Sequence, residues 1–324
     1  MNNNRIAKLL KVENLKVTIK DKKRPLHPVR GVSFSLTQGQ RVCLVGESGC
    51  GKTMTAFSIL RLLPEQFAIA GNILFDGTDI LSVPQEDMRK IRGHQIAMVF
   101  QEPMTALNPV LSIGFQIVEA ICAHKSIPKK EAKDLALSVM TNVGIPDPDL
   151  LYNQYPHQLS GGLRQRVMIA MALSCNPRLL IADEPTTALD VTIQAQILKL
   201  ICHLSVDMNL ALILITHNLG IVAKVAQRVM VMYAGSIVED GPVTDLFRSP
   251  LHPYTKGLLA SVPYGEGMKR KRLTSIPGRV PALDEIPKGC AFKDRCQIAK
   301  DICGDVMPQL KTVGNNRKVA CHLV

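Results

Sequence analysis

Residues 46 to 53, GESGCGKT, have the residue types and spacing of a loop that binds phosphate. Glycines allow backbone N–H groups to turn toward phosphate oxygens, and a helix that begins at the loop presents its positive end to them. Lys52 would reach the β- and γ-phosphates of a nucleotide, and Thr53 would offer its hydroxyl to Mg²⁺. The residues expected to hold the nucleotide are Gly46, Glu47, Ser48, Gly49, Cys50, Gly51, Lys52 and Thr53.

A second group of candidate residues follows the apolar run LLIA at 179–182. Asp183 and Glu184 come at the carboxyl end of this predicted buried strand, where α/β sheets bind ligands. Asp183 would hold Mg²⁺ through water, and Glu184 would polarise an attacking water. An acidic pair after a strand is by itself often only a solvated strand end, but a phosphate loop in the same chain makes it the expected partner.

The elements that must position these residues are predicted from hydrophobic patterning. Residues 7–45 alternate short apolar runs with turn signals, which is typical of mainly antiparallel strands that end in a buried strand, and residues 71–81 add a hairpin-like unit. From about residue 102 to 178, apolar residues recur at three- and four-residue spacing, which predicts helices. Two apolar strands follow, PRLLIADE and ALILITHN, with a helix between them. This alternation predicts an α/β fold with a mainly parallel core sheet.

The length and the change of character along the chain predict two domains. At 324 residues the chain exceeds one typical domain. After about residue 250, proline, glycine and charge increase and the hydrophobic period weakens. We therefore expect a nucleotide-binding domain over 1–250, with a helical subdomain at about 102–178, and a C-terminal extension over 251–324.

The net charge of +12 fits a nucleic acid, an anionic membrane surface or a polyphosphate as partner. Basic residues are spread along the chain, with short clusters at 20–24 and 269–272 and no basic stripe interleaved with aromatic residues, which argues against nucleic acid. No apolar run approaches the ~20 residues that span a bilayer, and the first ten residues lack the apolar core of a signal peptide. We expect a cytoplasmic chain, in which nine cysteines are not a disulfide framework.

Six ordered motifs resemble those of the ATP-binding cassette (ABC) family. Besides GESGCGKT and LLIADE, they are LSGGLRQR at 159–166, similar to the family's signature; VFQEP, with Gln101; TTALD, with Ala188, Leu189 and Asp190; and ITHN, with His217. The resemblance implies a P-loop ATPase of ABC type with an antiparallel β subdomain. It also implies catalytic roles for Glu184, His217 and Gln101, and a Mg²⁺ site that includes Gln101 beside Thr53 and Asp183.

The signature residues have their own physical rationale. Ser160, Gly161 and Gly162 open a predicted helix, so that a hydroxyl, backbone N–H groups and a helix N-terminus form an anion site. The family pairs two such domains head to tail, with ATP between the phosphate loop of one and the signature of the other, and Asp190 falls in the loop at this seam. A chain with one copy of each motif therefore implies a dimer.

Two positions depart from the family pattern. Leu163 stands where many members carry Gln, which leaves Ser160 and the glycines intact. Ile19 stands near the end of the first strand, where an aromatic residue commonly stacks on adenine. The resemblance therefore leaves the selectivity for the nucleotide base open.

Further segments resemble the ATPase subunits of oligopeptide and dipeptide importers, a group that includes nickel importers: QEPMTALNP, YPHQLSGG, DEPTTALDVTIQAQIL and SPLHPYTKGLL. The resemblance implies a peptide-transporting ATPase at the cytoplasmic face of the inner membrane. Its expected partners are two membrane permeases and, indirectly, an extracytoplasmic solute-binding protein. The second ATPase is expected to be a homologous chain, because the family often encodes two, with a second copy of this chain as the alternative. Whether a dipeptide, an oligopeptide, nickel or a metal chelate is carried stays open.

A soluble ABC ATPase acting on nucleic acid or ribosomes would carry two cassettes or a long coiled-coil insertion, and neither is present.

Four cysteines lie close together near the end of the chain, spaced by five, six and seventeen residues: Cys290, Cys296, Cys303 and Cys321. Metal ligation can replace a core in such a loop-rich segment, although the spacings lack the two-residue gaps of zinc ribbons. Spacing alone leaves an iron–sulfur cluster, zinc and unligated thiols open. In the importer family a similar tail, GCAFKDRCQIAKDIC with a later Cys followed by His, is associated with a 4Fe–4S cluster, whereas His322 could be a ligand in the zinc alternative.

The other cysteines have simpler interpretations. Cys43 and Cys175 lie in apolar runs and are expected to be packing residues, and Cys122 and Cys202 fall on predicted helices and are expected in the core. Cys50 lies inside the phosphate loop, where its reactivity depends on its exposure.

Overall fold

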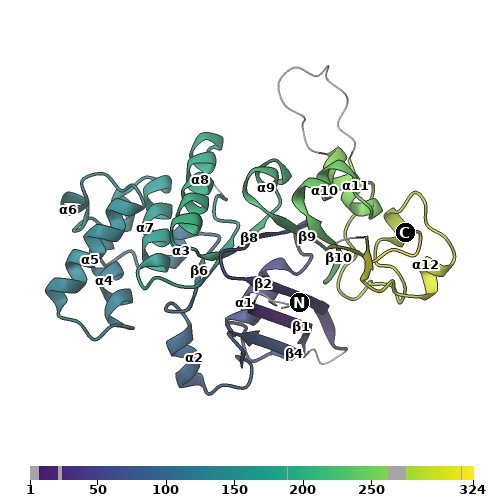
Figure 1. Ribbon diagram of the computed structural model, residues 1–324, viewed down its shortest axis with the longest axis horizontal. Helices are drawn as coiled ribbons and strands as arrows, with labels where there is room; N and C mark the ends of the chain where they lie inside the picture. Colours follow the sequence, from purple (N-terminus) through teal and green to yellow (C-terminus); the bar gives the residue numbers. More distant parts are fainter. Residues whose placement is uncertain (1–6, 21–23, 188, 262–274, 315) are drawn as a thin grey trace, which may run out of the picture. The chain divides into compact units, whose positions relative to one another are not determined.

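The computed structural model describes residues 7–20, 24–187, 189–261, 275–314 and 316–324 (Figure 1). Ala188, most of the basic cluster at 20–24 and all of the cluster at 269–272 lie outside these residues. The chain divides into two compact units. Unit 1 comprises Met1–Leu36, Arg41–Leu81 and Ile215–Val324, and unit 2 comprises Thr37–Gln40 and Ser82–Leu214.

Unit 1 contains the predicted antiparallel strands. They form a four-stranded sheet in the order β2-β1-β4-β5, from β1 (Lys8–Ile19), β2 (Leu26–Thr37), β4 (Phe67–Phe75) and β5 (Thr78–Asp79). The register of β1 against β4 shifts between Glu13 and Lys16, where Asn14 has a φ of 49°. A bulge of this kind moves the side-chain alternation by one residue. For this reason even-numbered Val12 and odd-numbered Leu15 are both buried.

A second set of strands in unit 1 carries the phosphate loop at one end and the C-terminal extension at the other. The strand order is β11-β12-β10-β9-β3, in which β3 and β9 are parallel and the remaining pairs are antiparallel. The strands are β3 (Arg41–Val45), β9 (Arg228–Tyr233), β10 (Ser236–Pro242), β11 (Lys311–Val313) and β12 (Arg317–Val319). The chain end thus continues the sheet of the cassette, as the yellow segment beside β10 in Figure 1 shows.

The helices of unit 1 are short. They are α1 (Lys52–Ile59), α9 (Leu219–Val225), α10 (Val243–Arg248), α11 (Pro253–Ala260) and α12 (Ile302–Asp305), with a 3₁₀ turn, η2 (Lys293–Arg295). Helix α11 carries Tyr254 and the η2 turn carries Arg295, and both side chains contact Glu47 of the phosphate loop.

Unit 2 contains the predicted helical region. The order of its strands is β8-β7-β6, from β6 (Ile96–Val99), β7 (Leu179–Asp183) and β8 (Ala211–Thr216, of which residues 211–214 belong to unit 2), and β6 runs parallel to β7. All residues of these strands are buried, which agrees with their nearly continuous apolar sequences. The helices are α2 (Gln85–Ile91), α3 (Pro103–Ala106), α4 (Ile113–Cys122), α5 (Lys129–Asn142), α6 (Pro148–Leu151), η1 (Pro156–Gln158), α7 (Gly161–Leu173) and α8 (Val191–Asp207).

The fold confirms the predicted α/β class with an antiparallel β sheet and a helical segment, but the predicted core positions of two cysteines are wrong. Cys43 and Cys175 are buried as expected, but Cys122 is exposed and Cys202 is only half-buried. Cys122 is the last residue of α4, whose buried face includes Ile117 and Ile121. The next residue along a helix points about 100° away, so Cys122 faces outward. No helix in the described parts of the chain is long and apolar enough to cross a membrane.

One buried carboxylate joins strand β10 to the C-terminal extension. Glu239, which is 0% exposed, accepts hydrogen bonds from the backbone N–H groups of Leu251 and His252, each at 2.9 Å. Its Oε1 also accepts a bond from Arg317 of β12 at 3.0 Å. A buried anion with three donors is stabilising only as long as every donor keeps its partner.

We predict that Glu239→Gln lowers the free energy of unfolding by about 2–4 kcal/mol, because the amide has no charge for Arg317 and turns an N–H group toward other donors. Urea denaturation followed by circular dichroism measures this. The control is Glu285→Gln, which removes a pair with Arg279 whose side chains are 51% and 81% exposed and should change stability by less than about 0.5 kcal/mol. Equal denaturation midpoints for the two variants would contradict the role of Glu239.

Candidate functional site

The phosphate loop of unit 1 lies between a buried strand and a helix, as predicted. Strand β3 ends at Val45 and α1 begins at Lys52. Gly51 precedes the helix with a φ of 100°, and a Cβ at this position would collide with the carbonyl oxygen of Pro28. Only glycine fits both the left-handed backbone and the close approach. Ser48 and Gly49, at the outer part of the loop, are exposed.

Lys52 is enclosed by its own loop. The side chain is only 5% exposed, and its ammonium donates hydrogen bonds to the carbonyl oxygens of Gly46 at 2.9 Å and Glu47 at 3.0 Å. Thr53, half-buried, follows in the first turn of α1. The loop therefore holds a cation and a helix N-terminus together, which is the arrangement that attracts phosphate.

Cys50 is a packing residue of this loop. It is 1% exposed, and burial raises the pKa of its thiol, although nearby Lys52 opposes that shift. Since the thiolate is the reactive form of cysteine, a buried thiol with a raised pKa is a poor nucleophile. The sequence alone left the reactivity of Cys50 open, and its burial in the structure indicates that its thiol is unreactive.

In unit 2, the two acidic residues and the glutamine predicted for the site lie at one edge of parallel strands. Asp183 ends β7 and is 2% exposed, Glu184 follows it, and Gln101 comes shortly after the neighbouring strand β6. Gln101 Nε2 lies 3.5 Å from Glu184 Oε2, and the hydroxyl of Thr187 donates to the same oxygen at 3.2 Å. The carboxylate of Glu184 is thereby oriented by two polar groups, of which Thr187 was not predicted.

Glu184 also has an unusual backbone conformation. Its φ is 43°, a left-handed value that is uncommon for residues other than glycine. Conformations of this kind cost of order 1 kcal/mol or more and cluster at functional sites. The sequence contains no sign of this feature, because Glu has no preference for left-handed backbone.

The predicted anion site at the signature is the N-terminus of α7, a helix of 13 residues. Ser160 caps it, its hydroxyl accepting from the backbone N–H of Leu163 at 3.3 Å. A Cβ on Gly161 would lie 3.1 Å from the side chain of Leu189, and one on Gly162 would lie 3.0 Å from that of Ile193, so a larger residue would have to displace these side chains. The departure at Leu163 affects the side chain, whereas the capping bond uses its backbone.

Three further predicted positions are exposed or half-buried. Asp190 is exposed and caps α8, accepting from the backbone N–H of Ile193 at 3.0 Å. His217 is exposed directly after β8. Ile19 is half-buried at the end of β1 and pairs across the sheet with Phe67 of β4, an aromatic residue that was not singled out from the sequence.

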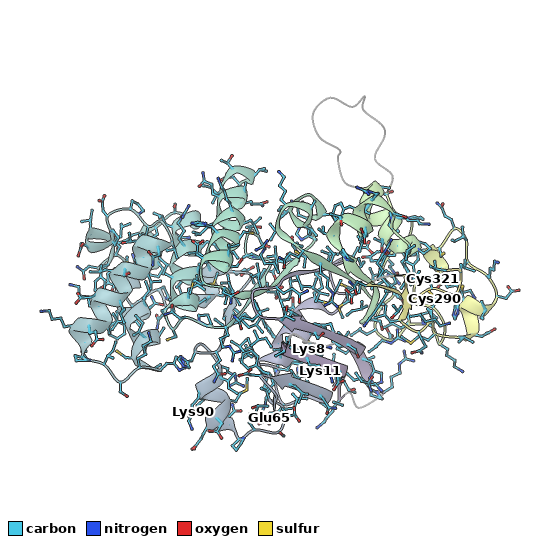
Figure 2. The ribbon with its side chains drawn as sticks, viewed as in Figure 1. Lys8, Lys11, Glu65, Lys90, Cys290 and Cys321 are labelled. Atoms are coloured by element: carbon cyan, nitrogen blue, oxygen red, sulfur yellow. The ribbon has the colours of Figure 1, made fainter. Side chains whose placement is uncertain are left out.

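The four cysteines of the extension interact with one another. Burial raises the pKa of the Cys290 thiol, and nearby Cys303, Cys321 and Cys296 raise it further. Figure 2 shows Cys290 and Cys321 close together in the C-terminal segment. The N–H of Leu323 donates to Cys321 Sγ at 3.5 Å. Nevertheless, among the residues with described positions, no three His, Cys, Asp or Glu side chains form a group that could hold a metal ion.

Comparisons with known proteins agree with this arrangement. A family model described as ABC transporter matches residues 29–187, and one described as the C-terminal region of oligopeptide/dipeptide transporters matches residues 238–303. The chain is 49% identical over 320 residues to the oligopeptide transport ATP-binding protein AppD of Bacillus subtilis, covering 98% of this chain and 97% of the relative. It is 48% identical over 316 residues to the dipeptide transport ATP-binding protein DppD of Haemophilus influenzae, covering 97% and 95%.

A solved structure shows the same fold. The post-hydrolysis dimer of the ATP-binding cassette MJ0796, bound to ADP and Pi, matches with a TM-score of 0.64 and 26% identity over 72% of this chain and 98% of that chain. Fold and site thus define an ATP-binding cassette ATPase, which implies ATP and Mg²⁺. Over nearly its whole length the chain belongs to the family of ATP-binding subunits of oligopeptide and dipeptide transporters.

We predict that Glu184→Gln lowers kcat for ATP hydrolysis by about 10²–10⁴-fold, because the amide cannot accept a proton from the attacking water. The dissociation constant for ATP should change by less than about twofold, and a closed dimer should accumulate with ATP. Phosphate release, equilibrium binding and light scattering measure these quantities. The control is Glu131→Gln, on the exposed first turn of α5. Undiminished hydrolysis in the Glu184 variant would exclude it as the base.

Proposed function

We propose that the chain is the ATP-hydrolysing motor subunit of an importer for dipeptides and oligopeptides. The observation that carries this proposal is similarity to peptide-transport ATPases along nearly the entire chain, with the extension included. An ATPase that shared only the cassette would not be expected to match in the extension. The similarity supports the peptide alternative over nickel or a metal chelate.

The individual residues have separate roles in this proposal. The phosphate loop, with Lys52, binds the β- and γ-phosphates, and Thr53, Gln101 and Asp183 hold Mg²⁺. Glu184 polarises the attacking water, and His217 contacts the γ-phosphate. The two hydrogen bonds at Glu184 Oε2 support its role, because a general base must be oriented before it can act.

The assembly follows from the signature. Ser160, Gly161, Gly162 and Asp190 face the nucleotide of a partner ATPase, a homologous chain or a second copy. ATP stabilises the closed dimer and hydrolysis allows it to open, so the bound nucleotide determines the populations of the closed and open conformations. The helices after Gln101 transmit closure to two permeases at the cytoplasmic face of the inner membrane, and an extracytoplasmic binding protein delivers the substrate. The net charge of +12 suits attraction to an anionic membrane leaflet. Membrane association that does not weaken with added salt would contradict this electrostatic attraction.

We further propose that Cys290, Cys296, Cys303 and Cys321 hold a 4Fe–4S cluster, with zinc as the alternative. Thiolates are suitable donors for either group, and Cys290 and Cys296 each interact with other cysteines of the extension. Since no three of these side chains form a metal-holding group in the described positions, binding would have to draw the sulfurs together. Backbone N–H groups also approach the sulfurs: those of Phe292 and Ile298 lower the pKa of Cys290 and Cys296, against the larger effect of burial. Hydrogen bonds to sulfur are typical of ligated thiolates. When bound, such a group would cross-link the extension.

We predict that cells whose transporter carries Lys52→Ala lose uptake of labelled dipeptides and oligopeptides, because the nucleotide phosphates lose their cation. Uptake of labelled nickel is measured in the same cells, with the unaltered transporter and an exposed-lysine variant, Lys90→Ala, as controls. Loss of nickel uptake with peptide uptake unchanged would keep the motor function and overturn the substrate.

We predict that the anaerobically purified chain contains iron and acid-labile sulfide, and that Ser replacements at the four extension cysteines remove both. Hydrogen exchange should then become faster after about residue 280, while the phosphate loop stays protected. Cys122→Ser, at an exposed position, is the matched control. Stoichiometric zinc without iron would favour the zinc alternative, and the absence of any metal would contradict the proposal.

A further inference from the structure

An arginine of the cysteine-bearing extension makes a two-pronged ion pair with the phosphate loop. Nη1 of Arg295 lies 2.6 Å from Oε2 of Glu47, and Nη2 lies 3.0 Å from Oε1. Glu47 is the second residue of GESGCGKT, whereas Arg295 directly precedes Cys296. Both residues belong to unit 1. Paired N–H···O bonds of this type fix geometry as well as charge.

The extension holds the guanidinium firmly. The side chain of Arg295 is only 5% exposed, and its Nε donates to the carbonyl oxygen of Pro277 at 2.8 Å. The guanidinium carbon lies 5.8 Å from the ring centroid of Tyr233 and 5.9 Å from that of Phe292. These contacts leave the side chain little rotational freedom, so the position of Glu47 depends on the fold of the extension.

The backbone of Glu47 is held as well, by Tyr254 of the extension and by Lys52 of the phosphate loop. Its N–H donates to the hydroxyl of Tyr254 on α11 at 2.8 Å, and its carbonyl oxygen accepts from Lys52 at 3.0 Å. The rings of Tyr254, Tyr233 and Phe292 pack together with centroids 4.6 to 5.4 Å apart. One residue thus connects the phosphate-binding lysine, through its backbone, with Arg295, through its side chain.

The sign of the charge explains why this pair is needed. A carboxylate in a loop that must receive the phosphates of ATP repels them, and the repulsion between like charges a few ångströms apart is considerable when they are partly shielded from water. Glu47 is 32% exposed in its side chain, so water screens it only in part. Arg295 supplies the compensating charge and turns the carboxylate toward the extension.

We propose that Arg295 is a positioning residue for ATP: it neutralises and orients Glu47, and so makes the cysteine-bearing extension part of the nucleotide-binding machinery. This inference rests on the proposed ATPase function. Because Arg295 directly precedes Cys296, whatever orders the cysteine segment also orders the guanidinium.

The test measures ATP affinity by titration calorimetry and steady-state hydrolysis on the full chain. Arg295→Met keeps the apolar length of the side chain and removes the charge, and we expect the dissociation constant and KM for ATP to rise about 10-fold, equivalent to about 1.4 kcal/mol. We expect kcat at saturating ATP to change by less than about threefold, since Arg295 acts on binding and not on the attacking water. Arg295→Lys keeps one charge but not the fork, and should lie between Met and the original residue.

The second substitution separates charge compensation from a merely structural role. Glu47→Gln removes the repelling charge, so the double variant Arg295→Met with Glu47→Gln should recover most of the lost affinity. A structural defect in the extension would not be repaired by an amide at residue 47. Arg279→Met is the control, because Arg279 forms an exposed pair with Glu285 in the same extension and should bind ATP within about twofold of the original chain.

The outcomes are distinct. Unchanged ATP affinity in Arg295→Met, or a double variant no better than Arg295→Met alone, would overturn the inference while leaving the ATPase function intact. If Arg295→Met does not fold, the ATP affinity of Arg295→Lys is compared with that of the double variant Arg295→Lys with Glu47→Gln. A double variant that binds ATP no better than Arg295→Lys alone would likewise overturn the inference. Failure of the original chain and of Arg279→Met to bind or hydrolyse ATP would instead overturn the proposed function itself.

Discussion

Buried carboxylates need cations, and among the described residues of unit 1 two carboxylates on strand β10 are each paired with an arginine. Asp240 and Glu239 lie side by side on β10 and are 2% and 0% exposed. Arg228 forms a two-pronged pair with Asp240 at 2.7 and 2.6 Å, and Arg317 pairs with Glu239 at 3.0 Å. A further pair joins the buried Arg295 to the half-buried Glu47 of the phosphate loop. Since an uncompensated buried charge is strongly destabilising, the strands and loops that supply these partners are constrained to fold together.

The need to pair these carboxylates ties the extension to the rest of unit 1. Strand β12, which provides Arg317, continues the sheet of β10, and the η2 turn provides Arg295. His252 is 1% exposed within the same region, and burial lowers its pKa to about 4, so this imidazole is neutral near pH 7 and adds no further charge to compensate. The extension therefore completes unit 1 through specific charges and through the packed rings of Tyr233, Tyr254 and Phe292.

The chemistry of the site depends on a different constraint, the placement of polar groups at the carboxyl ends of parallel strands. Gln101 and Glu184 come from different segments and meet because β6 and β7 are parallel neighbours. The left-handed backbone at Glu184 and the hydroxyl of Thr187 then fix where its carboxylate points. Such orientation is what the proposed role of Glu184 as a base requires.

Much was determined by the sequence alone, because it is encoded in short-range patterns. GESGCGKT required a loop between strand and helix, apolar runs predicted the buried strands, and the ordered motifs indicated the ABC family. Other features arise only from contacts between distant residues. The sequence contains no sign that Arg295 neutralises a carboxylate 248 positions away, that Thr187 orients Glu184, or that Cys122 faces outward while Cys50 is buried. Spacing along the chain carries no information on such contacts, since burial and charge pairing are decided by which segments the folded chain brings together.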